Sequence, residues 1–280
     1  MKKYKELILN LSLKKIYKYF FLNDFKKDGY YNHLKDLYYK FLLSKYPEYD
    51  RSNYEKKLNK LLSDREYYVD LTGQLNNLFE PTYANNLQNY YKLYEKQIFF
   101  KFLTYSINTK LIKNNYSEIY SFAINKINEP LNILEIGGGV PHGLIFNIWQ
   151  KGTSFCNNLT YIEADLLHSE FMAWYCKNNN LRVDIRFFPA AKTPTIKDTN
   201  YTFVFAKDIF EHLDEPEKLI DELISFTKNK NSLLCLDLEH KGAKSVQHIS
   251  PNLPILKNKL LDNGFKVIKK FGEVHVWHKD

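Results

Sequence analysis

Four residues that could bind a ligand lie around the end of one short apolar run. The run Leu131–Ile136 contains Glu135 at its last position but one, and Gly137, Gly138 and Gly139 follow it directly. Glycines at such a place let the backbone turn tightly and approach a ligand, because no Cβ stands in the way. A helix that starts after them would offer free amide groups to a polar or anionic group. We therefore predict a ligand-binding turn at residues 137–139, beside the carboxylate of Glu135.

A second acidic residue, Glu163, ends the next apolar run and lies 28 residues after Glu135. This is the spacing of one strand–helix–strand unit, and a carboxylate at the end of the second strand can accept hydrogen bonds from both hydroxyls of a ribose. The alternative is a surface glutamate that caps the following helix. Asp165 takes the ribose role if the strand ends two residues later. We favour Glu163 as the ribose-binding residue.

Three further residues, Asp208, Glu211 and His212, have helical spacing after the run Thr202–Phe205. At positions i, i+3 and i+4 they can share one face of a helix. Two carboxylates and an imidazole suit a divalent cation. The other interpretation is structural, with His212 hydrogen-bonded inside the fold.

Histidines near the strand ends are the natural candidates for a general base, because their pKa lies close to neutral pH. His212, His240 and His248 follow the fourth and fifth apolar runs, and His142 lies in the glycine-rich segment. We predict His212, His240 and His248 as catalytic candidates, with His142 facing the same pocket.

The pattern of Glu135, Gly137 and Gly139 resembles the first motif of class I S-adenosylmethionine-dependent methyltransferases. Residues 208–216, DIFEHLDEP, resemble the DxxEHLxxP segment that is frequent in the members acting on small molecules. The dinucleotide fingerprint G-x-G-x-x-G fails because position 142 is histidine. The resemblance covers residues 119–280. It implies S-adenosylmethionine as the cofactor, bound by Glu135, Gly137, Gly138, Gly139, Glu163 and Asp208.

The same resemblance implies a fold and raises the question of a metal. The fold is an α/β, Rossmann-like sheet with helices on both faces and a C-terminal antiparallel hairpin. A similar acid-x-x-Glu-His arrangement binds metal in ubiquinone-pathway O-methyltransferases and in small-RNA 3′-terminal methyltransferases. Asp208, Glu211 and His212 are therefore the predicted ligands if this chain uses a divalent metal, and they are structural if it does not.

The elements needed to position these residues can be predicted from apolar periodicity. Residues 1–118 have helical spacing, for example Leu34, Leu37, Tyr38, Phe41 and Leu42, and we expect a further long helix at Tyr90–Ile107. Short apolar runs separated by helix-length stretches then indicate a parallel sheet. These runs are Leu131–Ile136, Leu159–Ile162, Val183–Phe188, Thr202–Phe205 and Leu233–Leu238, and a hairpin follows at Gly264–Lys270 and Glu273–His278. We predict two regions: helical residues 1–118, serving as a substrate cap or an oligomerisation surface, and a cofactor-binding domain at 119–280.

Composition and cysteine content narrow the functional class. The net charge is +8, but lysine is scattered through the whole chain and arginine, which favours bidentate phosphate contacts, is scarce. We therefore expect no nucleic-acid partner. No apolar run has the roughly 20 residues that span a bilayer, and no signal peptide is expected at the N-terminus. The three cysteines lack metal or disulfide spacing, which indicates reduced thiols and a cytoplasmic protein.

The sequence thus predicts methyl transfer to a hydroxyl of a small metabolite or a sugar or glycan precursor. One alternative is a metal-assisted RNA 3′-end methyltransferase. Another is a non-catalytic partner subunit with the same fold, since Pro141 stands where many methyltransferases have a third glycine. A nicotinamide-dependent oxidoreductase shares the general fold. Two roles are left undecided for the N-terminal helices: they form a homodimer interface or a lid.

Overall fold

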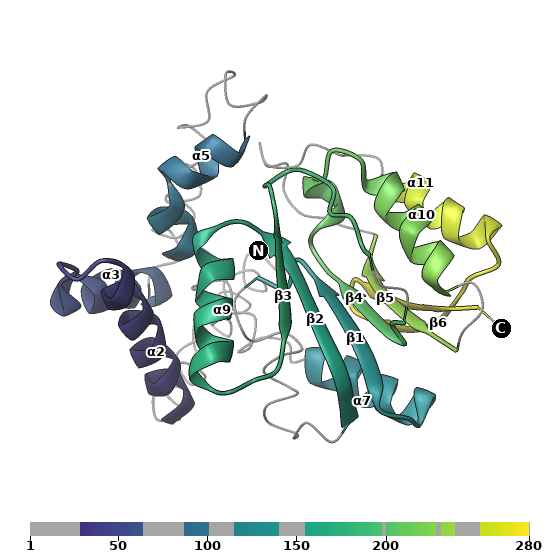
Figure 1. Ribbon diagram of the computed structural model, residues 1–280, viewed down its shortest axis with the longest axis horizontal. Helices are drawn as coiled ribbons and strands as arrows, with labels where there is room; N and C mark the ends of the chain where they lie inside the picture. The colour runs from purple at the N-terminus through teal and green to yellow at the C-terminus, as the bar shows by residue number, and fades with distance from the viewer. Residues whose placement is uncertain are drawn as a thin grey trace, which may run out of the picture.

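The computed structural model describes residues 29–63, 87–100, 115–139, 155–197, 200–227, 231–238 and 253–279 (Figure 1). Its helices are α2 (Gly29–Lys45), α3 (Arg51–Ser63), α5 (Leu87–Leu93), α7 (Asn115–Ile127), α9 (Leu167–Asn178), α10 (Pro216–Thr227) and α11 (Leu253–Asp262), with a 3-10 turn, η3, at Phe210–His212. Its strands are β1 (Leu131–Ile136), β2 (Cys156–Ala164), β3 (Asp184–Phe188), β4 (Phe203–Ala206), β5 (Leu233–Asp237), β6 (Lys266–Phe271) and β7 (Val274–His278).

The strands form one seven-stranded sheet with the order β3-β2-β1-β4-β5-β7-β6. β3, β2, β1, β4 and β5 are parallel, whereas β7 is antiparallel to both β5 and β6. The antiparallel pair is possible because β6 and β7 are joined by a short turn at Gly272, which has a φ of +64°. The predicted α/β sheet with a C-terminal antiparallel hairpin is confirmed.

The central strands are buried on both faces, and this is why they read as continuous apolar runs. Along β1, Leu131 and Ile133 contribute to one hydrophobic core, and Leu134 and Ile136 contribute to the other. The first core also contains residues of α2, α3, α7 and α9, and the second contains residues of α10 and α11. Helices therefore cover both faces of the sheet, as predicted (Figure 1).

The N-terminal helices share the core of the sheet. Phe171 of α9 stacks on Tyr38 of α2, with ring centroids 4.4 Å apart, and makes an edge-on contact with Phe41 at 5.2 Å. Lys45 at the end of α2 pairs with Glu170 of α9. The predicted boundary at residue 118 falls inside α7. The described part of residues 1–118 thus packs against the sheet domain through buried aromatic rings.

Two predicted elements need correction. β2 begins at Cys156 rather than Leu159, and its first residues are partly or fully exposed, so they carry no apolar signal. The long helix predicted at Tyr90–Ile107 is interrupted: α5 ends at Leu93, Tyr94 is a turn, and residues 95–100 are helical again. Residues 101–107 lie outside the described part of the chain.

Within the described ranges, no helix is both long enough and apolar enough to cross a membrane. Cys156, Cys176 and Cys235 are free thiols, as predicted.

Candidate functional site

The strand order identifies the edge of the sheet at which a ligand can bind. The chain runs from β1 outward to β2 and β3, and then returns to β4 on the other side of β1. In open α/β sheets, ligands bind outside the carboxyl ends of the strands where the order reverses, because the connecting segments diverge there. Ile136 and Ala206 are paired at this end of β1 and β4. The two segments that carry the predicted site, residues 137–139 and 208–212, follow them directly.

The glycine turn after β1 requires glycine for two different reasons. Gly137 and Gly139 have φ values of +68° and +66°, a conformation that L-residues with side chains rarely adopt. A Cβ on Gly138 would lie 2.6 Å from Oε1 of Glu135, so a side chain at this position would displace that carboxylate. A Cβ on Gly139, by contrast, would meet no heavy atom of the described residues within 4 Å. The turn therefore packs tightly against Glu135 and leaves open space at Gly139.

Glu163 lies against this turn. Its Oε2 accepts the backbone N–H of Gly139 at 2.8 Å, and its Oε1 accepts the N–H of Ala164 at 2.8 Å. The hydroxyl of Tyr161 donates to the carbonyl of Gly139 at 2.6 Å and also lies 3.1 Å from Oε2 of Glu163. The ends of β1 and β2 are thus joined through one carboxylate and one phenol.

The surroundings of Glu163 stabilise its charged form. Burial raises the pKa of this carboxyl group, but the hydrogen bond and charge of His168, together with the amides of Gly139 and Ala164, outweigh burial and hold the pKa below its usual value. His168 is itself buried, and its Nε2 lies 3.5 Å from Oε1 of Glu163. The site therefore contains a buried, ionised carboxylate beside the glycine turn.

The alternative ribose-binding residue, Asp165, has a different environment. Its carboxylate is about half exposed and lies 3.4 Å from Nζ of Lys92 in α5. Its ion pair therefore points to α5, whereas Glu163 bonds directly to Gly139. The geometry favours Glu163 over Asp165 as the acid beside the turn, and the ribose role itself stays a prediction.

The segment after β4 differs from the predicted helix. Asp208 has a φ of +52°, and only Phe210–His212 form a 3-10 turn, so Asp208, Glu211 and His212 do not share a helical face. Asp208 lies 3.3 Å from Nζ of Lys207 through Oδ2, and Glu211 is buried. Among the described residues, no group of three His, Cys, Asp or Glu side chains could hold a metal ion.

The predicted histidines are placed only in part. His212 is half-buried in the 3-10 turn after β4, on the same edge of the sheet as the glycine turn. His142, His240 and His248 lie outside the described residues. His212 is therefore the one predicted general base whose position the structure gives.

Two residues of the site were not predicted from the sequence, namely Tyr161 and His168. Tyr161 belongs to an apolar run and looks like a core residue, and His168 follows β2 without a recognisable motif. The alternation of side chains along β2 contains a usable signal for Tyr161, because it lies two positions before Glu163 and so on the same face of the strand. No sequence feature indicates the contact of His168.

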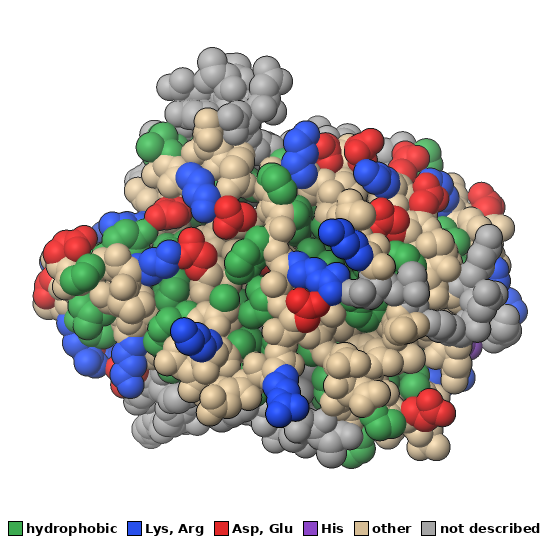
Figure 2. Space-filling model, in the orientation of Figure 1, with side chains coloured by type: hydrophobic (Ala, Val, Ile, Leu, Met, Phe, Trp, Pro, Cys, Tyr) green, Lys and Arg blue, Asp and Glu red, His purple; other side chains and the backbone are tan. Residues whose placement is uncertain are grey.

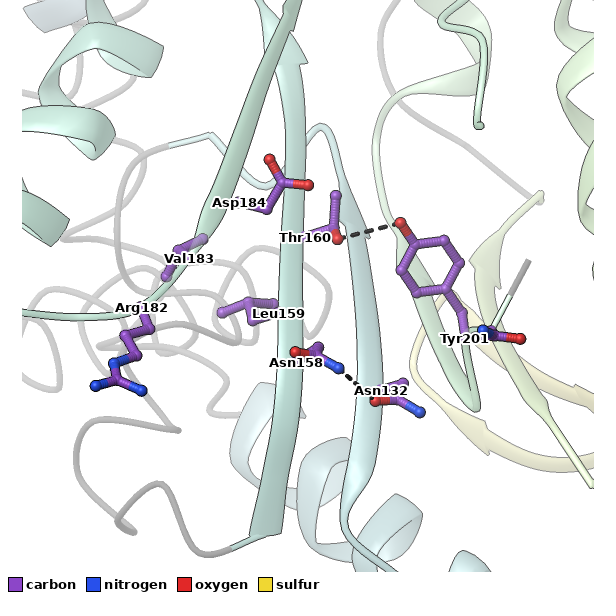
Figure 3. A pocket seen from close by; sticks show the side chains of 9 residues that line it. Asn132, Asn158, Leu159, Thr160, Arg182, Val183, Asp184 and Tyr201 are labelled. Atoms are coloured by element: carbon purple, nitrogen blue, oxygen red, sulfur yellow. Dashed lines mark hydrogen bonds between the residues drawn. The ribbon is translucent and has the colours of Figure 1, made fainter. Parts of the chain in front are cut away.

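A pocket of about 570 Å³ lies elsewhere, at the amino ends of the parallel strands (Figure 3). Figure 3 shows two hydrogen bonds along its wall, from Asn158 to Asn132 at 3.1 Å and from Tyr201 to Thr160 at 3.1 Å. None of the predicted site residues lines it. This pocket is at the opposite end of the strands from the glycine turn.

Comparison with known proteins gives structural likeness only. No family model and no curated protein sequence matches the chain. An S-adenosylmethionine-dependent methyltransferase from Aquifex aeolicus is 15% identical, with a TM-score of 0.40, over 71% of this chain and 98% of that one. A structure described as a putative S-adenosylmethionine-dependent methyltransferase from Methanococcus maripaludis is 12% identical, with a TM-score of 0.44, over 70% of this chain and 91% of that one. The mitomycin 7-O-methyltransferase MmcR is 13% identical, with a TM-score of 0.44, over 70% of this chain and 60% of that one.

Identities and TM-scores this low assign no activity to the chain. The structure shows a mixed seven-stranded sheet, as the class I methyltransferase resemblance implies, and it also shows a glycine turn after β1 and an acid at the end of β2 that bonds to this turn. The fold is therefore an α/β, Rossmann-like sheet, which is the fold that the resemblance implies.

Proposed function

We propose that the protein is an S-adenosylmethionine-dependent methyltransferase that acts on a hydroxyl group of a small metabolite or of a sugar or glycan precursor. The observation that carries this proposal is the hydrogen bond from the Gly139 amide to the buried carboxylate of Glu163, at the point where the strand order reverses. This carboxylate and the open space at Gly139 lie where open α/β sheets bind their ligands.

The residues of this edge fit the cofactor. The turn offers open space at Gly139 among the described residues, and the buried carboxylates of Glu163 and Glu135 lie beside the turn. In the proposal, Glu163 binds the ribose, Gly137–Gly139 line the cofactor, and Asp208 contributes from the end of β4. When bound, the cofactor supplies an electrophilic methyl group on a sulfonium.

The protein then has two tasks. It must hold the acceptor oxygen in line with the methyl group, which is a question of position, and it must remove the proton of the hydroxyl. His212 is half-buried at the cofactor edge, and we assign it the second task. His240 and His248 remain candidates for the same role.

A metal is not part of this proposal. Asp208, Glu211 and His212 do not lie on one helical face, and a metal-assisted RNA 3′-end reaction would need such a cluster. On the face shown in Figure 2, basic and acidic side chains are intermixed, so this face is not the basic surface that a polyanion would need.

The substrate class can be tested by methyl transfer from labelled S-adenosylmethionine to a panel of hydroxylated small molecules, free and nucleotide-linked sugars, and RNA with a free 3′ end. We expect label only in the small acceptors or sugars. With an accepted substrate, His212→Gln should lower kcat by about 100-fold or more, the usual worth of a general base, with little effect on cofactor binding.

His278→Gln is the matched control. His278 contacts the Ser232 carbonyl at the amino end of β5, at the other edge of the sheet, so its replacement should leave kcat unchanged. Label in RNA alone would replace the proposed substrate class, and an unchanged kcat in His212→Gln would remove His212 from the mechanism.

A further inference from the structure

Gln88 in α5 hydrogen-bonds to the ends of two strands that are distant from it in sequence. Its Nε2 donates to the carbonyl of Asp165, directly after β2, at 3.0 Å. Its Oε1 accepts the N–H of Ala190, two residues after β3, at 2.6 Å. The sequence separations are 77 and 102 residues. One carboxamide thus joins the carboxyl ends of two neighbouring parallel strands.

Other contacts of α5 converge on the same strand ends. Lys92 pairs with the carboxylate of Asp165, and the N–H of Asp165 donates to the carbonyl of Phe188 at 2.8 Å. The buried rings of Tyr90 and Tyr91 belong to the same hydrophobic core as Phe188. Figure 1 shows α5 at this end of the sheet, beyond the start of α9. A helix of the N-terminal region is therefore docked on the edge where the cofactor is proposed to bind.

The strand end that Gln88 holds also carries Glu163. Asp165 lies two residues after Glu163, and the amide between them, that of Ala164, donates to Oε1 of Glu163. A shift of the Asp165 carbonyl would move this amide and with it the carboxylate. Gln88 can therefore influence Glu163 through the backbone without contacting it.

We propose that Gln88 is a positioning residue for cofactor binding, and that α5 fastens the ends of β2 and β3 beside the ribose-binding acid. This inference rests on the proposed function. The role suits a glutamine, because a carboxamide both donates and accepts, whereas an ionised carboxylate only accepts. Since coupling between two sites is reciprocal, the bound cofactor should in turn hold α5 in place.

The test is calorimetric titration with S-adenosylhomocysteine, which has the cofactor's nucleoside but no transferable methyl group. Gln88→Met keeps the size of the side chain and removes both hydrogen bonds, so we expect binding about tenfold weaker, the loss typical of one or two such bonds. Leu93→Ala, at an exposed position of the same helix, should bind like the wild type.

Gln88→Glu separates a positioning role from a merely structural one. At about pH 8 the ionised carboxylate accepts from Ala190 but repels the Asp165 carbonyl, so binding should be as weak as in Gln88→Met. Near pH 5 the carboxyl group is partly protonated and regains a donor. The ratio of the Kd of Gln88→Glu to the Kd of the wild type, both measured at the same pH, should therefore be smaller near pH 5 than at about pH 8. The corresponding ratio for Gln88→Met should be the same at both pH values.

Amide hydrogen exchange gives an independent readout. Saturating S-adenosylhomocysteine should slow exchange in residues 87–100 of the wild type and have less effect in Gln88→Met. The inference would be overturned, and the proposed function left intact, if Gln88→Met bound S-adenosylhomocysteine with wild-type affinity. The same holds if the ratio of the Kd of Gln88→Glu to that of the wild type did not change with pH. Absence of binding by the wild type would overturn both.

Discussion

Glu163 connects several parts of the candidate site. It bonds to the glycine turn, to Ala164 at the end of β2, and to His168. Because the carboxylate is almost completely buried, these contacts must compensate for the loss of water. They do so only while the group is ionised, and this makes the site sensitive to acid.

The sign of this pH dependence follows from the lowered pKa. A carboxyl group whose pKa is lower in the folded state stabilises the fold above its unfolded-state pKa of about 4.5, and the contribution is lost as the pH falls through the folded value. We expect Glu163→Gln to make the free energy of unfolding depend less on pH below about 4.5, as measured by urea unfolding at a series of pH values. Glu118→Gln, at an exposed position of α7, should retain the wild-type dependence, and an equal dependence in both variants would contradict this assignment.

Replacing each of the three glycines of the turn by alanine should lower the free energy of unfolding by a different amount. Gly139→Ala introduces only backbone strain, about 1–2 kcal/mol, since its Cβ meets open space. Gly137→Ala adds a contact at 2.9 Å with Ile209 to the same strain and should be the most destabilising. Gly138→Ala should displace Glu135 and Tyr161. If the free energy of unfolding of Gly137→Ala is not lower than that of Gly139→Ala, the turn is packed differently from the structure described.

At the scale of elements, the N-terminal helices are part of the folded core. Phe41 of α2 is buried between Phe99 and Phe171. Phe41→Ala should therefore lower the free energy of unfolding by about 3–5 kcal/mol. Leu43→Ala, on the exposed side of α2, should change it by no more than about 0.5 kcal/mol. A cost for Phe41→Ala as small as that for Leu43→Ala would mean that α2 does not pack against α9 in solution.

The sheet could be predicted from the sequence because its central strands are buried on both faces. Runs such as Leu131–Ile136 are therefore mostly apolar, and β1 has these limits in the structure. Where burial is partial, the signal fails. The first residues of β2 are polar and exposed, and the predicted long helix at Tyr90–Ile107 is interrupted at Tyr94.

The candidate site could be predicted only where a local motif exists. Glu135 and the glycines follow one another in the chain, and Glu163 follows at the spacing of one strand–helix–strand unit. Gln88 and His168 have no such motif, since their contacts arise from the tertiary fold; the partners of Gln88 are 77 and 102 residues away. The helical face predicted for Asp208, Glu211 and His212 failed because Asp208 has a left-handed backbone conformation.

At the scale of the whole molecule, two hydrophobic cores enclose one sheet, and the candidate site occupies the carboxyl edge between them. Glycine turn, buried acid and docked helix meet at this edge, whereas the pocket of Figure 3 lies at the other end of the strands. The central claim is therefore that this edge binds S-adenosylmethionine.

Isothermal titration of the wild-type protein with S-adenosylmethionine, S-adenosylhomocysteine and NADH tests that claim most directly. Both sulfur ligands should bind with a Kd of micromolar order, about −8 kcal/mol, and NADH should not bind. A folded protein that binds neither sulfur ligand would contradict the proposed function, and binding of NADH alone would point to an oxidoreductase.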